Sequence, residues 1–386
     1  QERTSPRLKR ENRTFERKRI PAANAVTGRR KGMKNNLVMI VKNEERSLRK
    51  CLQAAKPLVD QIIIVDTGSS DKTVDIAEDM GAVIRKFPWG NDFAAARNFA
   101  LSQSDADWNL VLDADEYIRP GSSRGRLEQV LSSRKGKWLG GITLYDSYPD
   151  EGGISVSTSV LPRLLPKGVC YEGRIHEQPA GNAPCYPIPL QADHDGYLVA
   201  DKGERNLPYL EQAVAEHPKD GYYQFQLAST LRNLKRLEES LPHFREFYQM
   251  TGKREAYRPR GLVLYLYTLL DLGTDLHLDE ASEIVKQEEN GLGNWSDFSF
   301  VCGLFYMKRV LSDVQRYIGL LPNIERCYLR CLKSGERPEL GGVVGTGSFK
   351  AAYNLGAWYD VSVQNELAVK YYKQAQKKAM AWQWNV

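Results

Sequence analysis

The stretch IIIVDTGSSDKTVDIAEDMGA, residues 62–82, decides the fold. Its first positions are β-branched and the run stops at Asp66, after which TGSS has the composition of a turn and a helical pattern begins. We expect Ser70 or Asp71 to cap that helix and Gly81 to end it. A strand that ends in a carboxylate and turns into a helix is typical of an α/β sheet that holds a ligand at its strand ends.

The same alternation of strand and helix surrounds this stretch. An apolar run at 37–41 fits a buried strand, and the segment after it places apolar residues at helical spacing. Further strands are expected at 82–87 and 108–115, with a helix at 91–104 between them. This spacing predicts parallel β-α-β units, which bring the loop after each strand to one edge of the sheet. Asp66 and Asp113 should both lie at that edge.

An Asp-X-Asp triplet, Asp113-Ala114-Asp115, follows the strand that ends in Val111-Leu112. Such triplets are common on turns, but this one should face Asp66 at the end of a buried strand, where an unpaired charge is costly. A hard divalent cation, Mg²⁺ or Mn²⁺, that in turn holds phosphate oxygens would explain the cluster. The alternative is a structural cap or salt bridge. The sequence contains neither a Walker motif nor a G-x-G-x-x-G motif, so P-loop and dinucleotide sites are not indicated.

The chain changes character after Trp138, where segments bounded by Gly and Pro indicate antiparallel additions to the sheet. From Leu207 onward the pattern is helical. Two segments, 217–249 and 349–378, have the spacing of tetratricopeptide units, and degenerate versions lie near 262–287 and 298–318. We therefore expect four helical pairs in a short solenoid, an architecture that binds another protein or a second copy of itself. The alternative is a plain helical bundle.

Length and charge fit two domains preceded by an arm. The chain has 386 residues and a net charge of +6, but residues 1–34 alone hold twelve Lys or Arg and three Glu. We expect 1–34 to be a solvated arm, or alternatively one that docks on an acidic membrane face, a nucleic acid or an acidic leader peptide. No apolar run approaches the length of a membrane span and no signal-peptide pattern opens the chain, so we expect a cytoplasmic protein without a transmembrane segment. The six scattered cysteines favour reduced thiols over a zinc site or a disulfide framework.

Four motifs in order, MIVKNEERSLRKCL, IIIVDTGSSDKT, WGNDFAAARNFAL and LVLDADE, resemble the nucleotide-sugar half of the family 2 glycosyltransferases. The resemblance implies a GT-A fold over 35–200, followed by the tetratricopeptide-like helical domain at 201–386. It also implies a nucleoside diphosphate sugar donor, such as UDP-glucose, and a divalent metal, Mg²⁺ or Mn²⁺. A nucleic acid partner is not expected.

The resemblance assigns roles to individual residues. Val41, Asn43, Glu44, Asp66 and Thr67 would cradle the base and ribose of the donor. Arg97 would approach the nucleotide or its phosphates, Asp113 with Ala114 would contact the ribose or metal-bound water, and Asp115 would ligate the metal. Many relatives carry a second Asp where this chain has Thr67, and this departure leaves the base of the donor open.

Two further segments, GRIHEQP and ADHDGY, carry the remaining candidates. A lone histidine is more often a satisfied core or surface residue. At the end of a GT-A-like domain, however, these residues resemble the catalytic and third metal-ligand positions. Inverting transfer needs a base to take the acceptor proton. We expect Glu177 to be that base, with His176 as the second candidate, and His194 to be a metal ligand.

The order of catalytic domain, His-Glu-Gln-Pro, His-Asp-Gly-Tyr and helical repeats also resembles the bacterial glycocin peptide S-glycosyltransferases. That resemblance implies an acceptor peptide with a Cys thiol, as in a bacteriocin precursor, and a homodimer formed through the helical repeats. A thiol fits because it ionises more easily than a hydroxyl. The alternatives are a glycosyltransferase of cell-surface polysaccharide or lipid-linked glycan synthesis, and a non-catalytic scaffold.

Overall fold

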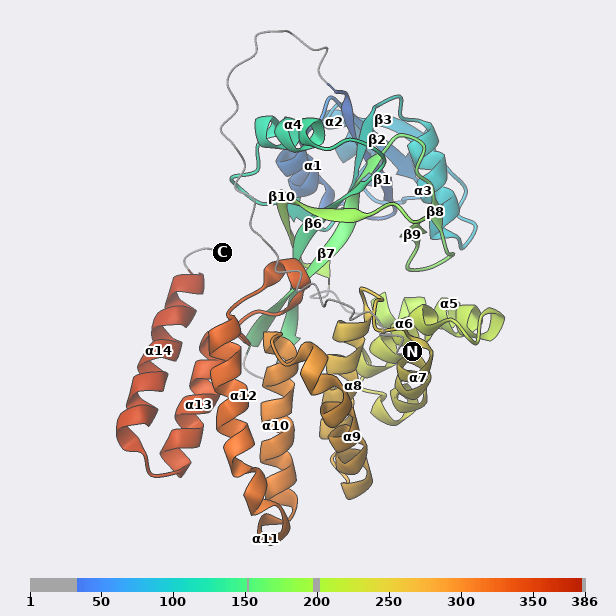
Figure 1. Ribbon diagram of the computed structural model, residues 1–386. Helices are drawn as coiled ribbons and strands as arrows, with labels where there is room; N and C mark the ends of the chain where they lie inside the picture. The colour runs from blue at the N-terminus through green and yellow to red at the C-terminus, as the bar shows by residue number, and fades with distance from the viewer. Residues whose placement is uncertain (1–32, 151–152, 197–201, 384–386) are drawn as a thin grey trace, which may run out of the picture. The chain divides into compact units, whose positions relative to one another are not determined.

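The computed structural model describes residues 33–150, 153–196 and 202–383 (Figure 1). The chain forms two units, Gln1–Gly32 and Met33–Val386, and only the second is described here. The basic arm expected at 1–34 therefore lies almost wholly outside the described residues. None of the helices in these ranges is long and apolar enough to cross a membrane.

The first part of the described chain is the predicted α/β half. Its parallel strands are β1 (Asn35–Val41), β2 (Gln61–Asp66), β3 (Val83–Lys86) and β4 (Trp108–Val111), in the order β3-β2-β1-β4. The order reverses at β1, since β2 and β3 lie on one side of it and β4 on the other. Val41 at the end of β1 is in register with Asp66 at the end of β2. The strand ends that carry Asp66 and Asp113 therefore share one edge, as predicted, and meet where ligands bind in such sheets.

Helices cover both faces of these strands. Leu37 and Met39 of β1 pack in one cluster with α1 (Leu48–Ala55), α2 (Thr73–Asp79) and α4 (Arg124–Ser133). Val38, which points to the opposite face, packs with Ala100 of α3 (Phe93–Ser102). Burial on both faces explains why β1 is a continuous apolar run instead of an alternating one.

The α2 boundaries correct one detail of the prediction. The helix begins after Lys72, not after Ser70 or Asp71. Asp71 lies one position before the cap, and its carboxylate accepts the Thr73 N–H at 3.0 Å. The predicted stop at Gly81 is confirmed: with φ +78° it accommodates the left-handed turn in which its N–H donates to the Glu78 carbonyl at 2.9 Å.

A long hairpin, β6 (Leu139–Asp150) and β7 (Gly153–Pro166), extends the sheet beside β4. β8 (Tyr171–Glu172) and β9 (Gln178–Pro179) form a separate antiparallel pair. These pairings confirm the antiparallel additions, but β10 (Cys185–His194) differs because it runs parallel to β6 and antiparallel to β5 (Glu116–Ile118). The long connection after β7 allows the chain to return to the sheet in the same direction as β6.

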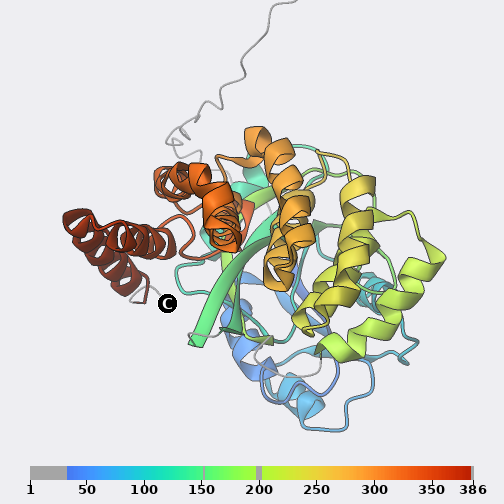
Figure 2. The same cartoon turned by 90° about the horizontal axis from the view of Figure 1, so that it is seen from below.

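From Lys202 the described chain is almost entirely helical, slightly earlier than Leu207. After α5 (Lys202–Glu216), four pairs follow in chain order (Figure 2). They are α6 (Gly221–Asn233) with α7 (Leu237–Met250), α8 (Arg258–Leu272) with α9 (Asp275–Leu292), α10 (Ser296–Ser312) with α12 (Leu321–Ser334), and α13 (Phe349–Val361) with α14 (Asn365–Gln383). The prediction of an α/β domain followed by four tetratricopeptide-like pairs is confirmed. The third pair has the short helix α11 (Val314–Tyr317) between its members.

One segment of the helical part joins the sheet. β11 (Gly342–Val343), between α12 and α13, pairs antiparallel with β7. Asp297 of α10 holds this segment, since its carboxylate accepts the Val343 N–H at 2.6 Å and the Thr346 hydroxyl at 3.1 Å. Gly342 has φ +129°, and a Cβ there would lie 2.2 Å from Oδ2 of Asp297. Only glycine permits this approach of backbone to carboxylate.

The buried Asp297 makes stability depend on pH. Burial raises the pKa of its carboxyl to about 6, although both hydrogen bonds oppose the rise. Because the pKa is raised in the folded state, the protonated Asp297 carboxyl stabilises the fold. This contribution is fully present below about pH 4 and is lost as the pH rises through about 6. The loss is at most about 3 kcal/mol for a shift of about two pKa units.

We expect Asp297→Asn to remove this dependence while keeping an acceptor for the Val343 N–H. The free energy of unfolding would be measured in urea at pH 5 and at pH 7.5. Between these two pH values it should fall by about 1–2 kcal/mol less in the variant than in the unaltered chain. The exposed Asp360 of α13 offers a control, since Asp360→Asn should leave the interval unchanged. Identical pH dependence in the unaltered chain and Asp297→Asn would contradict the assignment.

Candidate active site

The ends of β1 and β2 are held by a tight turn. The Thr67 N–H and hydroxyl both donate to the Val41 carbonyl at 3.0 Å. Asp66 is buried, and its carboxylate accepts the N–H groups of Gly68 and Ser69 at 3.2 and 3.0 Å. The Asp66 carboxylate therefore organises the loop that follows its own strand, a local geometry typical of Asx turns.

Asn43 and Glu44 lie opposite this turn. Asn43 adopts φ +56°, and its side-chain oxygen accepts the Ser70 N–H at 2.8 Å. The Glu44 N–H donates to the Thr73 hydroxyl at 2.7 Å. The loops after β1 and β2 therefore fix each other at the position predicted to cradle the base and ribose.

A chain of alternating charges crosses the end of β4. Arg97 of α3 donates to Asp113 at 2.7 Å and also pairs with Glu177. Arg163 of β7 donates to the other Asp113 oxygen at 2.8 Å and pairs with Glu116. Glu177, Arg97, Asp113, Arg163 and Glu116 thus form one connected network, in which two arginines compensate three carboxylates.

Burial and the arginines act in opposite directions on these carboxyls. Burial alone would raise the pKa of Asp113, but the guanidiniums of Arg97 and Arg163 hold it well below its usual range. For Glu116 burial prevails over Arg163, so its pKa is raised above the ordinary value. Asp113 is therefore firmly ionised, and its side chain is 39% exposed, which leaves it accessible from solvent.

Asp115 and His194 lie beside each other. Nε2 of His194 is 3.5 Å from a carboxylate oxygen of Asp115, and Nδ1 donates to Asp146 of β6 at 2.8 Å. Asp146 also accepts the Ser159 hydroxyl at 3.1 Å. Burial lowers the pKa of the imidazole, but the hydrogen bonds to Asp115 and Asp146 outweigh it and raise the pKa to about 10.

His176 lies in the loop between β8 and β9 in a strained conformation, with φ +49°. Burial lowers the pKa of its ring, and Nε2 has no hydrogen-bond partner among the described residues. Its neighbour Glu177 points to Arg97 instead. The structure therefore connects Glu177, but not the His176 ring, to the charged network.

Most of the predicted site residues thus lie at the strand ends of one sheet. The structure places Val41, Asn43, Glu44, Asp66 and Thr67 in the β1–β2 loops, Arg97, Asp113 and Glu177 in the charged network, and Asp115 with His194 next to it; Ala114 is buried between the two aspartates. The sequence reasoning missed Arg163, Glu116 and Asp146. Glu116 directly follows Asp115 and could have been suspected, whereas Arg163 and Asp146 are brought in by the β6–β7 hairpin.

A metal could be held here by only part of this cluster. The residues in the described ranges contain no group of three or more His, Cys, Asp or Glu side chains arranged to hold a metal ion. Asp115 offers an oxygen ligand, and Nε2 of His194 beside it becomes a nitrogen ligand once it loses the proton that the raised pKa keeps on the ring. Mg²⁺ usually takes one or two carboxylates from the protein and its remaining ligands from substrate phosphates and water. Two protein ligands therefore fit an ion that would be completed by a diphosphate.

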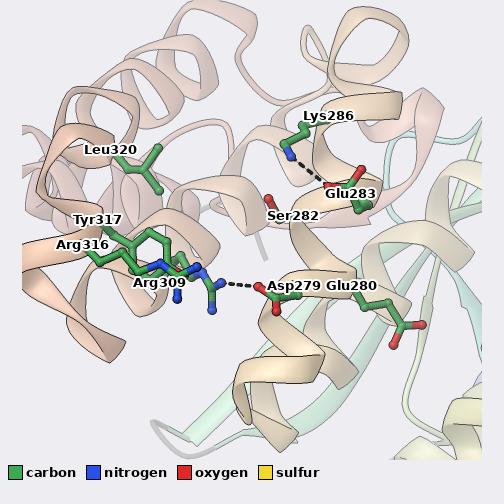
Figure 3. A pocket seen from close by; sticks show the side chains of 9 residues that line it. All are labelled: Asp279, Glu280, Ser282, Glu283, Lys286, Arg309, Arg316, Tyr317 and Leu320. Atoms are coloured by element: carbon green, nitrogen blue, oxygen red, sulfur yellow. Dashed lines mark hydrogen bonds and ion pairs between the residues drawn. The ribbon is translucent and has the colours of Figure 1, made fainter.

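A separate hollow of about 450 Å³ lies in the helical part, between α9 and the segment 309–320 (Figure 3). Its charged residues neutralise one another, since Arg309 pairs with Asp279, and Lys286 donates to Glu283 at 2.8 Å. None of the predicted site residues lines this hollow, and we assign it no chemistry.

Residues 37–147 match the family model "Glycosyl transferase family 2". This segment contains β1 to β4 and both aspartates of the Asp-X-Asp triplet, so the matched residues are those that build the site. This part of the chain is a family 2 glycosyltransferase domain, as predicted.

Particular relatives resemble longer parts of the chain. The chain is 48% identical over 208 residues to a TPR repeat-containing protein of Synechococcus elongatus, covering 48% of this chain and 49% of the relative. It is 28% identical over 221 residues to the SPbeta prophage-derived glycosyltransferase SunS of Bacillus subtilis, and the match covers 54% of this chain and 51% of SunS. The chain therefore spans about half the length of these curated relatives.

Among solved structures, the chain is similar to a glucosyl-3-phosphoglycerate synthase from Mycobacterium tuberculosis, in complex with Mn²⁺, UDP and glucosyl-3-phosphoglycerate. The TM-score is 0.26 at 22% identity, over 29% of this chain and 44% of that one. At this TM-score the likeness adds nothing to the sequence match.

Arg163 should be the residue on which the stability of the site depends. In Arg163→Met, Asp113 and Glu116 would lose a shared buried partner, and we expect unfolding free energy to fall by about 3–5 kcal/mol. Arg124 is a matched control because it too joins two carboxylates, those of Asp60 and Glu128, but is far more exposed. Arg124→Met should cost at most about 1 kcal/mol. Equal losses of the two variants in urea unfolding would show that burial of the Arg163 network carries no special stability.

Proposed function

We propose that the chain is an inverting glycosyltransferase that moves a sugar from a nucleoside diphosphate sugar to a peptide side chain. The observation that carries the proposal is the position of Asp113 and Asp115 after β4, beside β1, at which the strand order reverses. Both residues lie within the segment that matches the family 2 model. Ligands of open α/β sheets bind outside the carboxyl ends of the strands at this place.

The donor would lie across the β1 and β2 loops, with its base and ribose against Val41, Asn43, Glu44, Asp66 and Thr67. The hydrogen bonds that fix these loops support this role, because a preformed cradle loses little entropy on binding. Asp113 is ionised and partly exposed, so it can accept hydrogen bonds from ribose hydroxyls. Arg97 acts by holding Asp113 and Glu177 in place, a role different from direct phosphate contact.

The donor diphosphate would be bound with a divalent metal, Mg²⁺ or Mn²⁺, held by Asp115 and His194. When bound, such an ion neutralises the charge that develops on the leaving diphosphate. Asp146 supports this assignment, because a carboxylate on Nδ1 orients the ring and leaves Nε2 directed at Asp115.

Glu177 is the proposed base. An acceptor sulfur attacks the anomeric carbon, the bond from that carbon to the diphosphate oxygen breaks, the acceptor proton passes to Glu177, and the nucleoside diphosphate leaves. The Glu177 side chain is only 10% exposed and is oriented by Arg97, which supports a positioned base. His176 is less suited, because its ring is not linked to the network.

The acceptor would be a peptide thiol of a bacteriocin-like precursor. The similarity to SunS supports this class, and the four helical pairs offer an extended surface of the kind that holds peptides. Transfer to cell-surface polysaccharide or lipid-linked glycan is the second candidate.

A homodimer through the helical repeats is part of the proposal. The last described pair, α13 and α14, and the turn between them expose several apolar side chains. They are Tyr353, Val361, Val363, Val369 and Met380. A second copy could cover them.

Two variants should separate metal binding from proton transfer. Asp115→Asn should abolish Mn²⁺-dependent binding of UDP-glucose in calorimetry and lower turnover by at least about 100-fold. Glu177→Gln keeps an acceptor for Arg97, so donor binding should persist while turnover falls about 100-fold or more. Full turnover in EDTA would refute the metal, and loss of donor binding in Glu177→Gln would refute its role as base.

The acceptor class can be decided by mass spectrometry of products. The full chain would be incubated with a panel of UDP-sugars, Mn²⁺, and either a peptide containing one Cys, its Cys→Ser analogue, or undecaprenyl phosphate. We expect a hexose on the Cys peptide and much less on the Ser analogue, because a thiol ionises near neutral pH. Modification of the lipid alone would favour the second candidate.

A further inference from the structure

We propose that the start of the helical part, α5 and α6, belongs to the active site, because it holds the segment 173–178 that carries His176 and Glu177. Tyr222 of α6 is in this view a positioning residue for Glu177. The inference rests on the proposed function for the role of Glu177, and it concerns a part of the chain that would otherwise be assigned only to acceptor binding.

The first observation is apolar. Ile175, directly before His176, is only 2% exposed, and the buried residues that pack with it come from the two helices: Leu207 and Leu210 from α5, Leu227 and Leu231 from α6. Phe93 of α3, in the α/β half, is one of the partly buried residues that pack against this cluster. Burying an Ile side chain contributes about 1.5–3 kcal/mol, so this residue anchors the segment firmly to the helices.

The second observation is polar. The Tyr222 hydroxyl donates to the His176 carbonyl at 3.3 Å and accepts from Gln178 Nε2 at 2.8 Å. It therefore bridges the residues on either side of Glu177. The hydroxyl of the neighbouring Tyr223 lies close to Gly173, since a Cβ added at Gly173 would be 3.2 Å from it. Gly173 also has φ +94°, a conformation that favours glycine.

The third observation is strain. His176 has φ +49°, a conformation that costs about 1–3 kcal/mol for such a residue and persists only where its surroundings impose it. The strands on either side, β8 and β9, have two residues each and cannot impose it alone. The α/β half supplies the Phe93 N–H to the Arg174 carbonyl at 2.9 Å and the pair of Arg97 with Glu177. From the helical side, Ile175 packs with α5 and α6, and the Tyr222 hydroxyl of α6 contacts His176 and Gln178.

Glu177 is thus clamped between the sheet and the helices. Arg97 fixes its carboxylate from one side, while Ile175 and the Tyr222 hydroxyl fix its backbone from the other. A change in α5 or α6 should move the base relative to Asp113 without touching the β1 and β2 loops. The expected signature is an effect on turnover with no effect on donor binding.

The test uses Tyr222→Phe in the full chain. Loss of one bridging hydroxyl should lower kcat roughly 3- to 10-fold, leave KM for the UDP-sugar unchanged, and speed amide hydrogen exchange at 173–179. Tyr359→Phe is the matched control, since it removes a 2.5 Å hydrogen bond to Glu325 in the last part of the helical array. It should change neither kcat nor exchange at 173–179.

Ile175→Ala provides a second, independent change and should speed exchange at 173–179 more strongly than Tyr222→Phe. If exchange is unchanged in both variants, the helices do not hold the segment and the inference is overturned. If exchange quickens but kcat does not fall, Tyr222 has no positioning role. Because exchange is measured without any sugar, it decides the support of the segment even if the chain transfers no sugar and the proposed function fails.

Discussion

The site depends on one physical constraint: carboxylates that stand at the end of a buried strand must be compensated. Asp113 and Glu116 follow β4 within a few residues, and Glu177 approaches from another loop. Without cations among them, their mutual repulsion and their loss of hydration would make the folded state unfavourable. Arg97 and Arg163 supply that compensation from a helix and from a strand on opposite sides of Asp113. The packing of α3 and of β7 against β4 is therefore tied to the ionisation of the site.

This constraint also explains what could be predicted from the sequence. Apolar runs, turn residues and helical spacing are local signals, and they were sufficient for β1 to β4, for α1 to α3 and for the outer helical pairs. Asp66 and Asp113 were placed on one edge correctly because parallel β-α-β units leave little freedom in this respect. The N-cap of α2 was predicted at Ser70 or Asp71, whereas the helix is capped at Lys72. The carboxylate of Asp71, one residue before the cap, accepts an N–H of the first turn, so the sequence signal for a cap was displaced.

The compensating residues could not be predicted in the same way. Arg163 meets Asp113 only because Leu110 of β4 is in register with Leu164 of β7, and a shift of one residue would turn Arg163 to the opposite face. Asp146 meets His194 only because β10 returns parallel to β6, contrary to the antiparallel addition that the turn residues favoured. Ion pairs between distant strands depend on register and direction, neither of which leaves a periodic trace in the sequence.

The short strand β11 has a consequence for how such a protein could change over time. Arrays of helical pairs ordinarily gain or lose units easily, because each unit contacts only its neighbours. Here Gly342 and Val343 pair with β7, and Lys350 at the start of α13 donates to Ser155 of β7 at 3.1 Å. A unit inserted between α12 and α13 would have to break one of these attachments to the sheet. The array therefore cannot be lengthened at this point without losing part of its attachment to the sheet.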